Sequence, residues 1–273
     1  MRRNRAISST LVGLTRALGH ALVSEHVARQ PGLLQALDPR VRVVGLLALV
    51  LAVTLSRRIS VVLAMFCAAI LIALLSRVSL ATLVTRVWLV VLLFTGVIAL
   101  PALFLTPGDA VFTTPGGVLR ITAQGATTAL LLIARVETAV TFTTLLVLTT
   151  PWMHVLKALR AFHVPQEVVM MLAMTHRYVF LLAETASQMF ESRQSRTVGV
   201  LDSATQRRVT TRTAGVLLSK SVELSNDVFL AMQSRGFRGD VKILSEFRMC
   251  AWDYVGLTAF LAVGAFAVWM GRS

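Results

Sequence analysis

Charged residues are scarce in this chain, and acidic residues are the scarcer kind. Only 15% of the 273 residues are charged, whereas a soluble domain carries about 25%. The 13 acidic residues face 27 basic ones, which leaves a formal net charge of +14. With 56% hydrophobic residues, the composition excludes an ordinary soluble domain and predicts a protein of the lipid bilayer. The basic excess is interpreted as a signal of membrane topology and not as a nucleic-acid footprint.

Cysteine pairs, metal-binding patterns and nucleotide-binding patterns are also lacking. Cys67 and Cys250 have no CxxC spacing, which excludes a disulfide framework or a zinc knuckle and favours small packing residues. His154, His163 and His176 match no HExxH pattern, so we expect no catalytic site, no resident metal and no cofactor in this chain. Neither GxxxxGKS nor GxxxxGKT occurs, and any ATP energy must therefore come from another chain.

Long apolar runs occupy much of the sequence. A transmembrane helix needs about 20 apolar residues to cross about 30 Å of hydrocarbon. The runs that approach this length cover residues 41–55, 59–75, 87–105, 118–148 and 254–270. The fourth run is too long for a perpendicular crossing, so its helix is expected to tilt, bend or leave the bilayer. The prediction is an all-α polytopic membrane protein with about five transmembrane helices and a cytoplasmic helical domain inserted before the last one.

Basic residues predict how these helices are oriented, because the cytoplasmic flanks of membrane proteins collect Lys and Arg. Seven arginines precede or begin the first run, whereas the connection at 106–118 contains no basic residue and one acid, Asp109. The N-terminus is therefore predicted to be cytoplasmic and the 106–118 connection external. Arg57 and Arg58 depart from the rule, since they lie in a predicted external turn. The expected location is the inner or plasma membrane.

Four segments are expected along the chain. Residues 1–41 form an N-terminal cytoplasmic or interfacial segment, 42–150 the first four transmembrane helices, 151–251 the cytoplasmic helices and 252–273 the last transmembrane helix. In the first segment, apolar residues recur at helical spacing and predict an amphipathic helix, which either lies on the inner membrane surface or packs on the protein. These residues are Ile7, Leu11, Leu14, Leu18 and Leu22.

The segment 151–251 has a composition of its own, with 13 of the 27 basic and 8 of the 13 acidic residues. Pro151 and Pro165 stand where helices can begin. Helices are predicted at 152–162, 165–195 and 206–234. The third carries an apolar stripe that is expected to face another helix. The stripe contains Leu218, Val222, Ser225, Phe229 and Met232.

The second of these helices is apolar around almost its whole circumference, which predicts that it is buried. Its methionines either fill a core or repack around a moving neighbour. Residues 165–183 are long enough to suggest a sixth span. His176 and Arg177 would be costly at the centre of a bilayer, however, so a position beneath the membrane domain is favoured.

Two charges, Arg135 and Glu137, lie within the fourth apolar run. They are two residues apart and do not share a helix face, so each needs its own partner. They either line a transport pathway or form structural pairs with other helices, and the structural interpretation is favoured because the run is long enough to leave hydrocarbon.

Similar motifs end the two long cytoplasmic helices. Each has an arginine followed by a glycine, which fits a left-handed helix C-cap. Such arginines either complement the helix macrodipole or offer their guanidinium groups to carboxylates of partner proteins. The sequence leaves both interpretations open. The residues are Ser195, Arg196 and Thr197 in the first motif and Ser234, Arg235 and Gly236 in the second.

These motifs and several others together resemble one family, the transmembrane T component of energy-coupling factor (ECF) transporters, and within it the CbiQ-like cobalt and nickel branch. The other motifs are Leu37-Asp38-Pro39-Arg40, Leu148-Thr149-Thr150-Pro151, Leu156-Lys157-Ala158-Leu159-Arg160 with Val164-Pro165, and the run from His176 to Leu182. The family motif is commonly Ala-Arg-Gly. The second motif here departs from it only at its first residue, and the first motif keeps only the arginine.

The resemblance implies a non-catalytic scaffold with coupling helices. Each arginine motif would dock on one of two ABC ATPases, which bind the ATP and Mg, and their motion would pass to a separate substrate-binding S component in the membrane. The resemblance also allows a small accessory membrane subunit. The cobalt or nickel ion would not bind this chain. The alternative is a stand-alone secondary transporter or channel that uses Arg135 and Glu137, but the hydropathy shows no inverted repeat.

Overall fold

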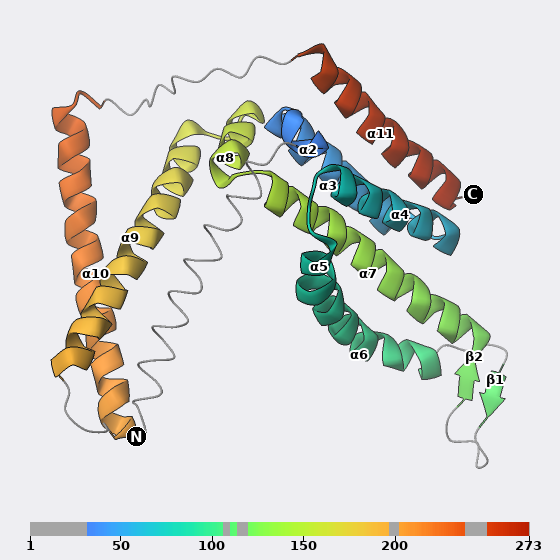
Figure 1. The fold of residues 1–273 in the computed structure, drawn as a ribbon, viewed down its shortest axis with the longest axis horizontal. Coiled ribbons are helices and arrows are strands. Elements are labelled where there is room, and N and C mark those ends of the chain that lie inside the picture. Colours follow the sequence, from blue (N-terminus) through green and yellow to red (C-terminus); the bar gives the residue numbers. More distant parts are fainter. Residues whose placement is uncertain (1–31, 106–109, 114–119, 197–201, 238–249, 273) are drawn as a thin grey trace. The chain divides into compact units, whose positions relative to one another are not determined.

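A computed structural model describes residues 32–105, 110–113, 120–196, 202–237 and 250–272, and these residues are helical nearly throughout (Figure 1). The chain divides into two compact units. The membrane unit contains the described residues up to Ala158 together with those from 250 onward. The two-helix unit contains the described residues from Leu159 to 237. The N-terminal amphipathic helix predicted at the start of the chain lies outside the described residues.

The membrane unit contains most of the helices. They are α2 (Leu33–Ala36), α3 (Pro39–Leu55), α4 (Ile59–Leu75), α5 (Leu80–Leu83), the π-helix η1 (Val84–Trp88), α6 (Leu89–Leu105), α7 (Ala123–Thr149) and α11 (Ala251–Arg272). A short antiparallel hairpin of β1 (Ala110–Thr113) and β2 (Arg120–Thr122) pairs Thr113 with Arg120. The helix α8 (Trp152–Ala161) leads along the chain to α9 (Gln166–Arg196) and α10 (Ser203–Ser234), which form the two-helix unit.

The helix α3 begins where its sequence provides both a cap and a fixed φ angle. Asp38 is the N-cap, and its carboxylate accepts a hydrogen bond from the backbone N–H of Arg40 at 2.9 Å. Pro39 follows at the first helical position, where its missing N–H costs nothing. The first apolar run therefore becomes a helix with a sharply defined start.

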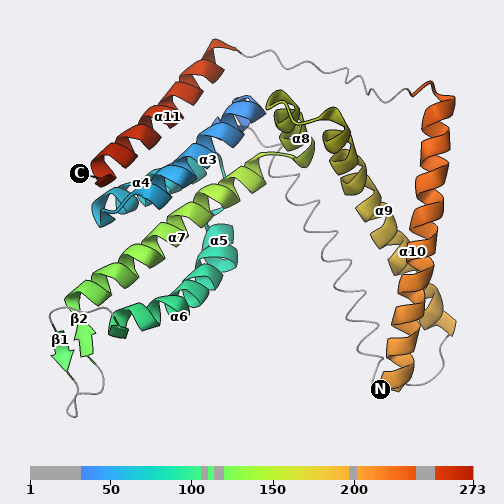
Figure 2. The same cartoon turned by 180° about the vertical axis from the view of Figure 1, so that it is seen from behind.

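The last helix, α11, packs along α3, and both views show the two side by side (Figures 1 and 2). At one end, the backbone N–H of Asp38 donates to the Asp253 carboxylate at 2.7 Å. At the other end, the N–H of Arg57 donates to the carbonyl of Gly271 at 3.1 Å. The two helices are therefore parallel. A Cβ atom at Gly45 would lie 2.5 Å from the Phe260 ring, so glycine permits their close approach.

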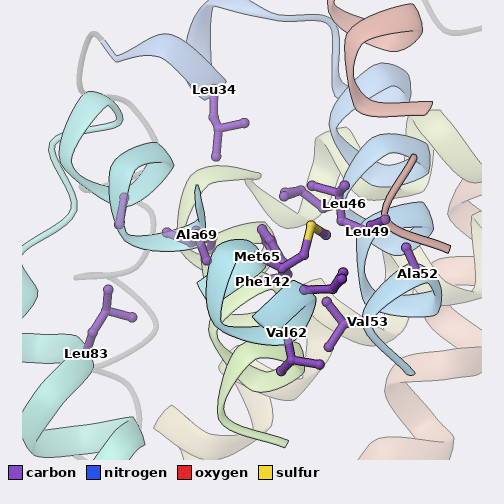
Figure 3. Packing of buried hydrophobic residues seen from close by; sticks show 14 of the residues in the cluster. Leu34, Leu46, Leu49, Ala52, Val53, Val62, Met65, Ala69, Leu83 and Phe142 are labelled. Atoms are coloured by element: carbon purple, nitrogen blue, oxygen red, sulfur yellow. The ribbon is translucent and has the colours of Figure 1, made fainter. Parts of the chain in front are cut away.

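The core of the membrane unit lies between α3, α4 and α7 (Figure 3). Phe142 and Leu145 of α7 are fully buried against side chains of α3 and α4. Leu46 and Val53 come from α3, and Val62 comes from α4. Aliphatic and aromatic side chains thus pack α7 against α3 and α4, which lie far from it in the sequence.

The predicted spans agree with most helices but not with all of them. The bounds of α3, α4 and α11 match the first, second and last apolar runs within a few residues. The helix of the third run begins earlier than predicted, at Leu80 and not at 87. There α5, η1 and α6 form one continuous helical stretch with Pro101 inside it. The fourth run was predicted too long, since β2 occupies residues 120–122 and α7 begins at Ala123.

Length and composition confirm an all-α membrane fold. Among the described residues, three helices are long and apolar enough to cross a bilayer, namely α7, residues Gln166–Arg193 of α9, and α11, while Ile59–Leu75 and Leu89–Pro101 are shorter apolar helices. Because α9 meets this criterion, its position beneath the membrane domain stays a prediction.

The two-helix unit by itself does not bury most of α9, so the predicted burial of this helix stays a prediction. Within the two-helix unit the helix packs on α10 (Figures 1 and 2), and its buried apolar side chains are Val169, Ala186 and Phe190. Met171 is 68% exposed and Val179 53%. One neighbouring helix covers one side of a cylinder, so α10 does not cover the opposite apolar side of α9.

Candidate functional site

The second arginine motif ends α10 in a Schellman turn. The N–H of Gly236 donates to the carbonyl of Gln233 at 2.9 Å, and the N–H of Phe237 donates to the carbonyl of Met232 at 3.0 Å. Gly236 has a φ of +80°, a left-handed conformation that favours glycine. The predicted left-handed C-cap is confirmed at this helix.

Within this motif, the arginine alone offers its side chain to a partner. The Ser234 hydroxyl donates back to the carbonyl of Ala231 at 3.0 Å, which satisfies one of the last carbonyls of α10. Arg235 occupies the C-cap position and is exposed. Among the residues that the structure describes, its guanidinium has no hydrogen-bond or ion-pair partner. The turn therefore presents a free cation at the end of a long helix.

The first motif has the same arrangement where it is described. Ser195 and Arg196 are the last residues of α9, and both are exposed. The Ser195 hydroxyl donates to the carbonyl of Ser192 at 2.9 Å. Thr197 and Gly199 lie outside the described residues, so the C-cap predicted here stays a prediction. The guanidinium of Arg196, like that of Arg235, has no partner within the described part of the chain.

An apolar groove of about 600 Å³ runs between α9 and α10. Met170, Met171 and Met174 of α9 face it together with Phe229 and Met232 of α10. The predicted stripe on α10 is thus partly confirmed: its C-terminal half lines the groove. Leu218 and Val222 at its other end are 68% and 56% exposed. The methionine-rich surface is open and adaptable.

Arg135 has a structural partner inside the membrane unit. Its Nη2 atom donates to the carbonyl of Ser56 at 2.7 Å. Ser56 is the C-cap of α3, and its carbonyl belongs to the helix end that lacks an intrahelical partner. This contact joins α7 to the end of α3, as the structural interpretation expects.

Glu137 differs from Arg135. It is only 7% exposed, and neither carboxylate oxygen accepts a hydrogen bond within the described residues. The hydroxyl of Thr141, one turn later, accepts a hydrogen bond from the indole N–H of Trp88 at 3.0 Å. The two intramembrane charges are therefore not brought together in one site.

One buried arginine, Arg42, connects three backbone positions. In the sequence it is one of the seven arginines that predict the membrane topology. Arg42 is 4% exposed. Its guanidinium donates to the carbonyls of Leu37 at 2.9 Å, Thr149 at 2.6 Å and Gln35 at 3.4 Å. Leu37 caps α2, and Thr149 is the last residue of α7. A cation thus satisfies carbonyls at two helix C-termini, where the macrodipole favours positive charge.

Two aspartates serve helix N-termini in the same region. Asp253 accepts from the N–H of Asp38 and, at 2.8 Å, from the N–H of Cys250. Both aspartates are buried and interact electrostatically with Arg42. We call Asp38, Arg42, Thr149 and Asp253 the helix-end cluster. An arginine inside an apolar run was the sequence signal for it, whereas nothing in the sequence paired Asp38 with Asp253.

His154 of α8 adjoins this cluster. Burial lowers the pKa of its imidazole, and the positive charges of Arg42 and Lys157 lower that pKa further, while Asp38 acts in the opposite direction. The imidazole is therefore held in its neutral form near neutral pH.

Potential metal ligands do not gather within the described residues: no three His, Cys, Asp or Glu side chains form a group there. Cys67 and Cys250 are free and exposed, so their interpretation as packing residues is wrong.

Comparison with known proteins places the chain in a family. The CbiQ family, described as "Cobalt transport protein", matches residues 32–244. An uncharacterized protein of Methanocaldococcus jannaschii, MJ1571, is 30% identical over 88% of this chain and 83% of its own length. The cobalt transport protein CbiQ of Rhodobacter capsulatus is 32% identical over 55% of this chain and 62% of its own. Nickel permease LarQ of Lactiplantibacillus plantarum is 32% identical over 42% of each chain. Because the family matches most of the sequence, this chain belongs to the CbiQ family of cobalt transport proteins.

Proposed function

We propose that this chain is the transmembrane coupling subunit, or T component, of an ECF-type ABC importer for cobalt or nickel. It transmits ATP-driven motion from two cytoplasmic ATPases to a separate substrate-binding membrane subunit. The chain itself is non-catalytic and lies in the inner or plasma membrane with its N-terminus in the cytoplasm. The names of its relatives support cobalt or nickel as the cargo.

The observation that carries this proposal is the pair of exposed arginines, Arg196 and Arg235, each at the end of a long helix and without a partner in the described chain. Two similar helix ends suit two similar partner proteins. Guanidinium groups form charge-assisted, often bidentate bonds with carboxylates. The sequence also has no phosphate-binding loop, so ATP must be hydrolysed by other chains.

Charge reversal at both helix ends tests the proposal. We expect Arg196→Glu combined with Arg235→Glu to abolish co-purification of the ATPases, because each new carboxylate repels the acidic groups that the arginine paired with. Membrane insertion should be unchanged, since both side chains are exposed. Pull-down from solubilised membranes, with immunoblots of the membrane fraction, measures both.

The matched control reverses two exposed arginines elsewhere on α10, Arg207→Glu with Arg212→Glu. This control has the same change of net charge and should retain the ATPases. Full ATPase retention in the Arg196 and Arg235 variant would contradict the coupling assignment.

The buried carboxyl of Glu137, which accepts no hydrogen bond from the described part of the chain, is the observation that favours a second candidate, a stand-alone transporter or channel. Arg135, the other pathway charge of that candidate, bonds to Ser56 instead. Reconstituted chain without ATPases decides between the two: metal uptake by the chain alone supports the second candidate and contradicts the first.

A further inference from the structure

Along the sequence, the helix-end cluster is close to two points at which the membrane unit leads to, or follows, the two-helix unit. The chain leaves α7 at Thr149 and continues through Pro151 into α8 and α9. It returns from α10 to the membrane unit at α11, whose third residue is Asp253. Movement of α9 and α10 can therefore reach the membrane helices through the backbone at two points, the end of α7 and the start of α11.

Both entry points are hydrogen-bonded to the start of α3. Arg42 of α3 donates to the carbonyl of Thr149 at 2.6 Å, and the N–H of Asp38 donates to the carboxylate of Asp253 at 2.7 Å. The paired residues are separated by 107 and 215 positions in the sequence. Thus one short stretch, from Asp38 to Arg42, is hydrogen-bonded both to the end of α7 and to the start of α11.

The chemistry of these contacts makes them stiff. Arg42 and Asp253 are charged and almost fully buried, and charge-assisted hydrogen bonds are the shorter and stronger kind. The planar guanidinium spreads over three carbonyls in fixed directions, which a flexible ammonium group does not reproduce. Further along α3, the close packing of Phe260 on Gly45 continues the contact between α3 and α11.

We propose that Arg42, together with Asp253, is the joint that transmits movement of the coupling helices to the membrane helices, which makes both of them positioning residues for transport. This inference rests on the proposed function. A side chain that only stabilised the fold would affect assembly, ATP hydrolysis and transport together. A transmitting joint affects the ratio of metal taken up to ATP hydrolysed.

The test uses the complete transporter, purified through this chain with its ATPases and substrate-binding subunit and reconstituted in liposomes. The variants are Arg42→Met, which keeps the length of the side chain without its donors, and Asp253→Asn, which replaces one acceptor oxygen by a donor. Uptake of Co²⁺ and hydrolysis of ATP are measured in the same vesicles. We expect both variants to retain the ATPases and hydrolyse ATP, while Co²⁺ uptake per ATP falls by about two- to thirty-fold, the range in which residues between coupled sites act.

Arg42→Lys and Arg57→Met complete the design. The lysine variant keeps the charge but not the planar fork, so it should give an intermediate ratio. Arg57 is an exposed arginine at the opposite end of α3, and Arg57→Met should leave the ratio unchanged. An unchanged ratio of Co²⁺ uptake to ATP hydrolysis in either Arg42→Met or Asp253→Asn would overturn the proposed transmitting role. Loss of both variants from the membrane would also overturn it, because the cluster would then be a requirement for folding. Absence of ATPases from the wild-type preparation would instead overturn the proposed function.

Discussion

At the scale of single residues, opposite charges are sorted by helix end. Arg42 serves the C-terminal carbonyls of α2 and α7, whereas Asp38 and Asp253 accept from N–H groups at the starts of α3 and α11. This sorting follows the direction of the helix macrodipole. The charged side chains of this cluster are therefore satisfied largely by backbone groups. A search of the sequence for oppositely charged side chains at helical spacing does not reveal such contacts.

His154 gives this cluster a pH dependence. Since burial and the nearby Arg42 and Lys157 lower the pKa of its imidazole, the unfolded chain takes up a proton near the ordinary pKa of about 6.5 before the folded chain does. The free energy of unfolding therefore falls as the pH drops below about 6.5 and stops falling below the folded pKa. Replacing His154 by glutamine should flatten the dependence of the melting temperature on pH between about pH 7 and 5.

Thermal unfolding of detergent-solubilised protein over this pH range measures the effect. Met153→Gln, at an exposed neighbouring position of α8, is the matched control: it introduces the same side chain without removing a titrating group and should retain the wild-type profile. An identical slope in the His154→Gln variant and the wild type would show that His154 does not contribute to the pH dependence.

At the scale of elements, apolar runs predicted the helices well but not their interruptions. The run at 59–75 matches α4 residue for residue, because an uninterrupted apolar sequence alone defines it. The π-turn at Val84–Trp88 and the hairpin before α7 were not predicted. The π-helix carries a contact that local hydropathy does not reveal, since the indole N–H of Trp88 donates to the hydroxyl of Thr141 in α7.

Helix ends were predictable where backbone geometry demands one residue type. Gly236 marked the end of α10 because its left-handed conformation excludes most side chains. We expect Gly236→Val to weaken ATPase co-purification, since a β-branched residue costs about 1–2 kcal/mol in that conformation, roughly a five- to thirty-fold change in the population of the Schellman turn that positions Arg235.

Titrating the ATPases against immobilised chain measures this change. Gly236→Asn is the matched variant, because asparagine tolerates the left-handed region, and it should bind more tightly than Gly236→Val. Equal binding by the valine variant and the wild type would mean that the Schellman turn is not needed to present Arg235.

At the scale of the whole molecule, the composition was sufficient to predict an all-α membrane protein, and the family match confirms a transport component. Composition was not sufficient to place α9. Its apolar residues suit either lipid or protein, and residues Gln166–Arg193 meet the length and hydropathy of a span. Met171 and Val179 are among the apolar residues of α9 that α10 leaves exposed.

Labelling from one side of the membrane separates these two arrangements. In a Cys67→Ala, Cys250→Ala background, Asp109→Cys should react with an impermeant thiol reagent added outside intact cells, because it lies in the connection without basic residues. Thr205→Cys, an exposed position in α10, should react only after the cells are opened. If α9 crossed the membrane, it would carry α10 to the outside, and Thr205→Cys would then be labelled in intact cells. The same experiment therefore tests the orientation of the chain and decides whether the exposed face of α9 meets lipid or a cytoplasmic partner.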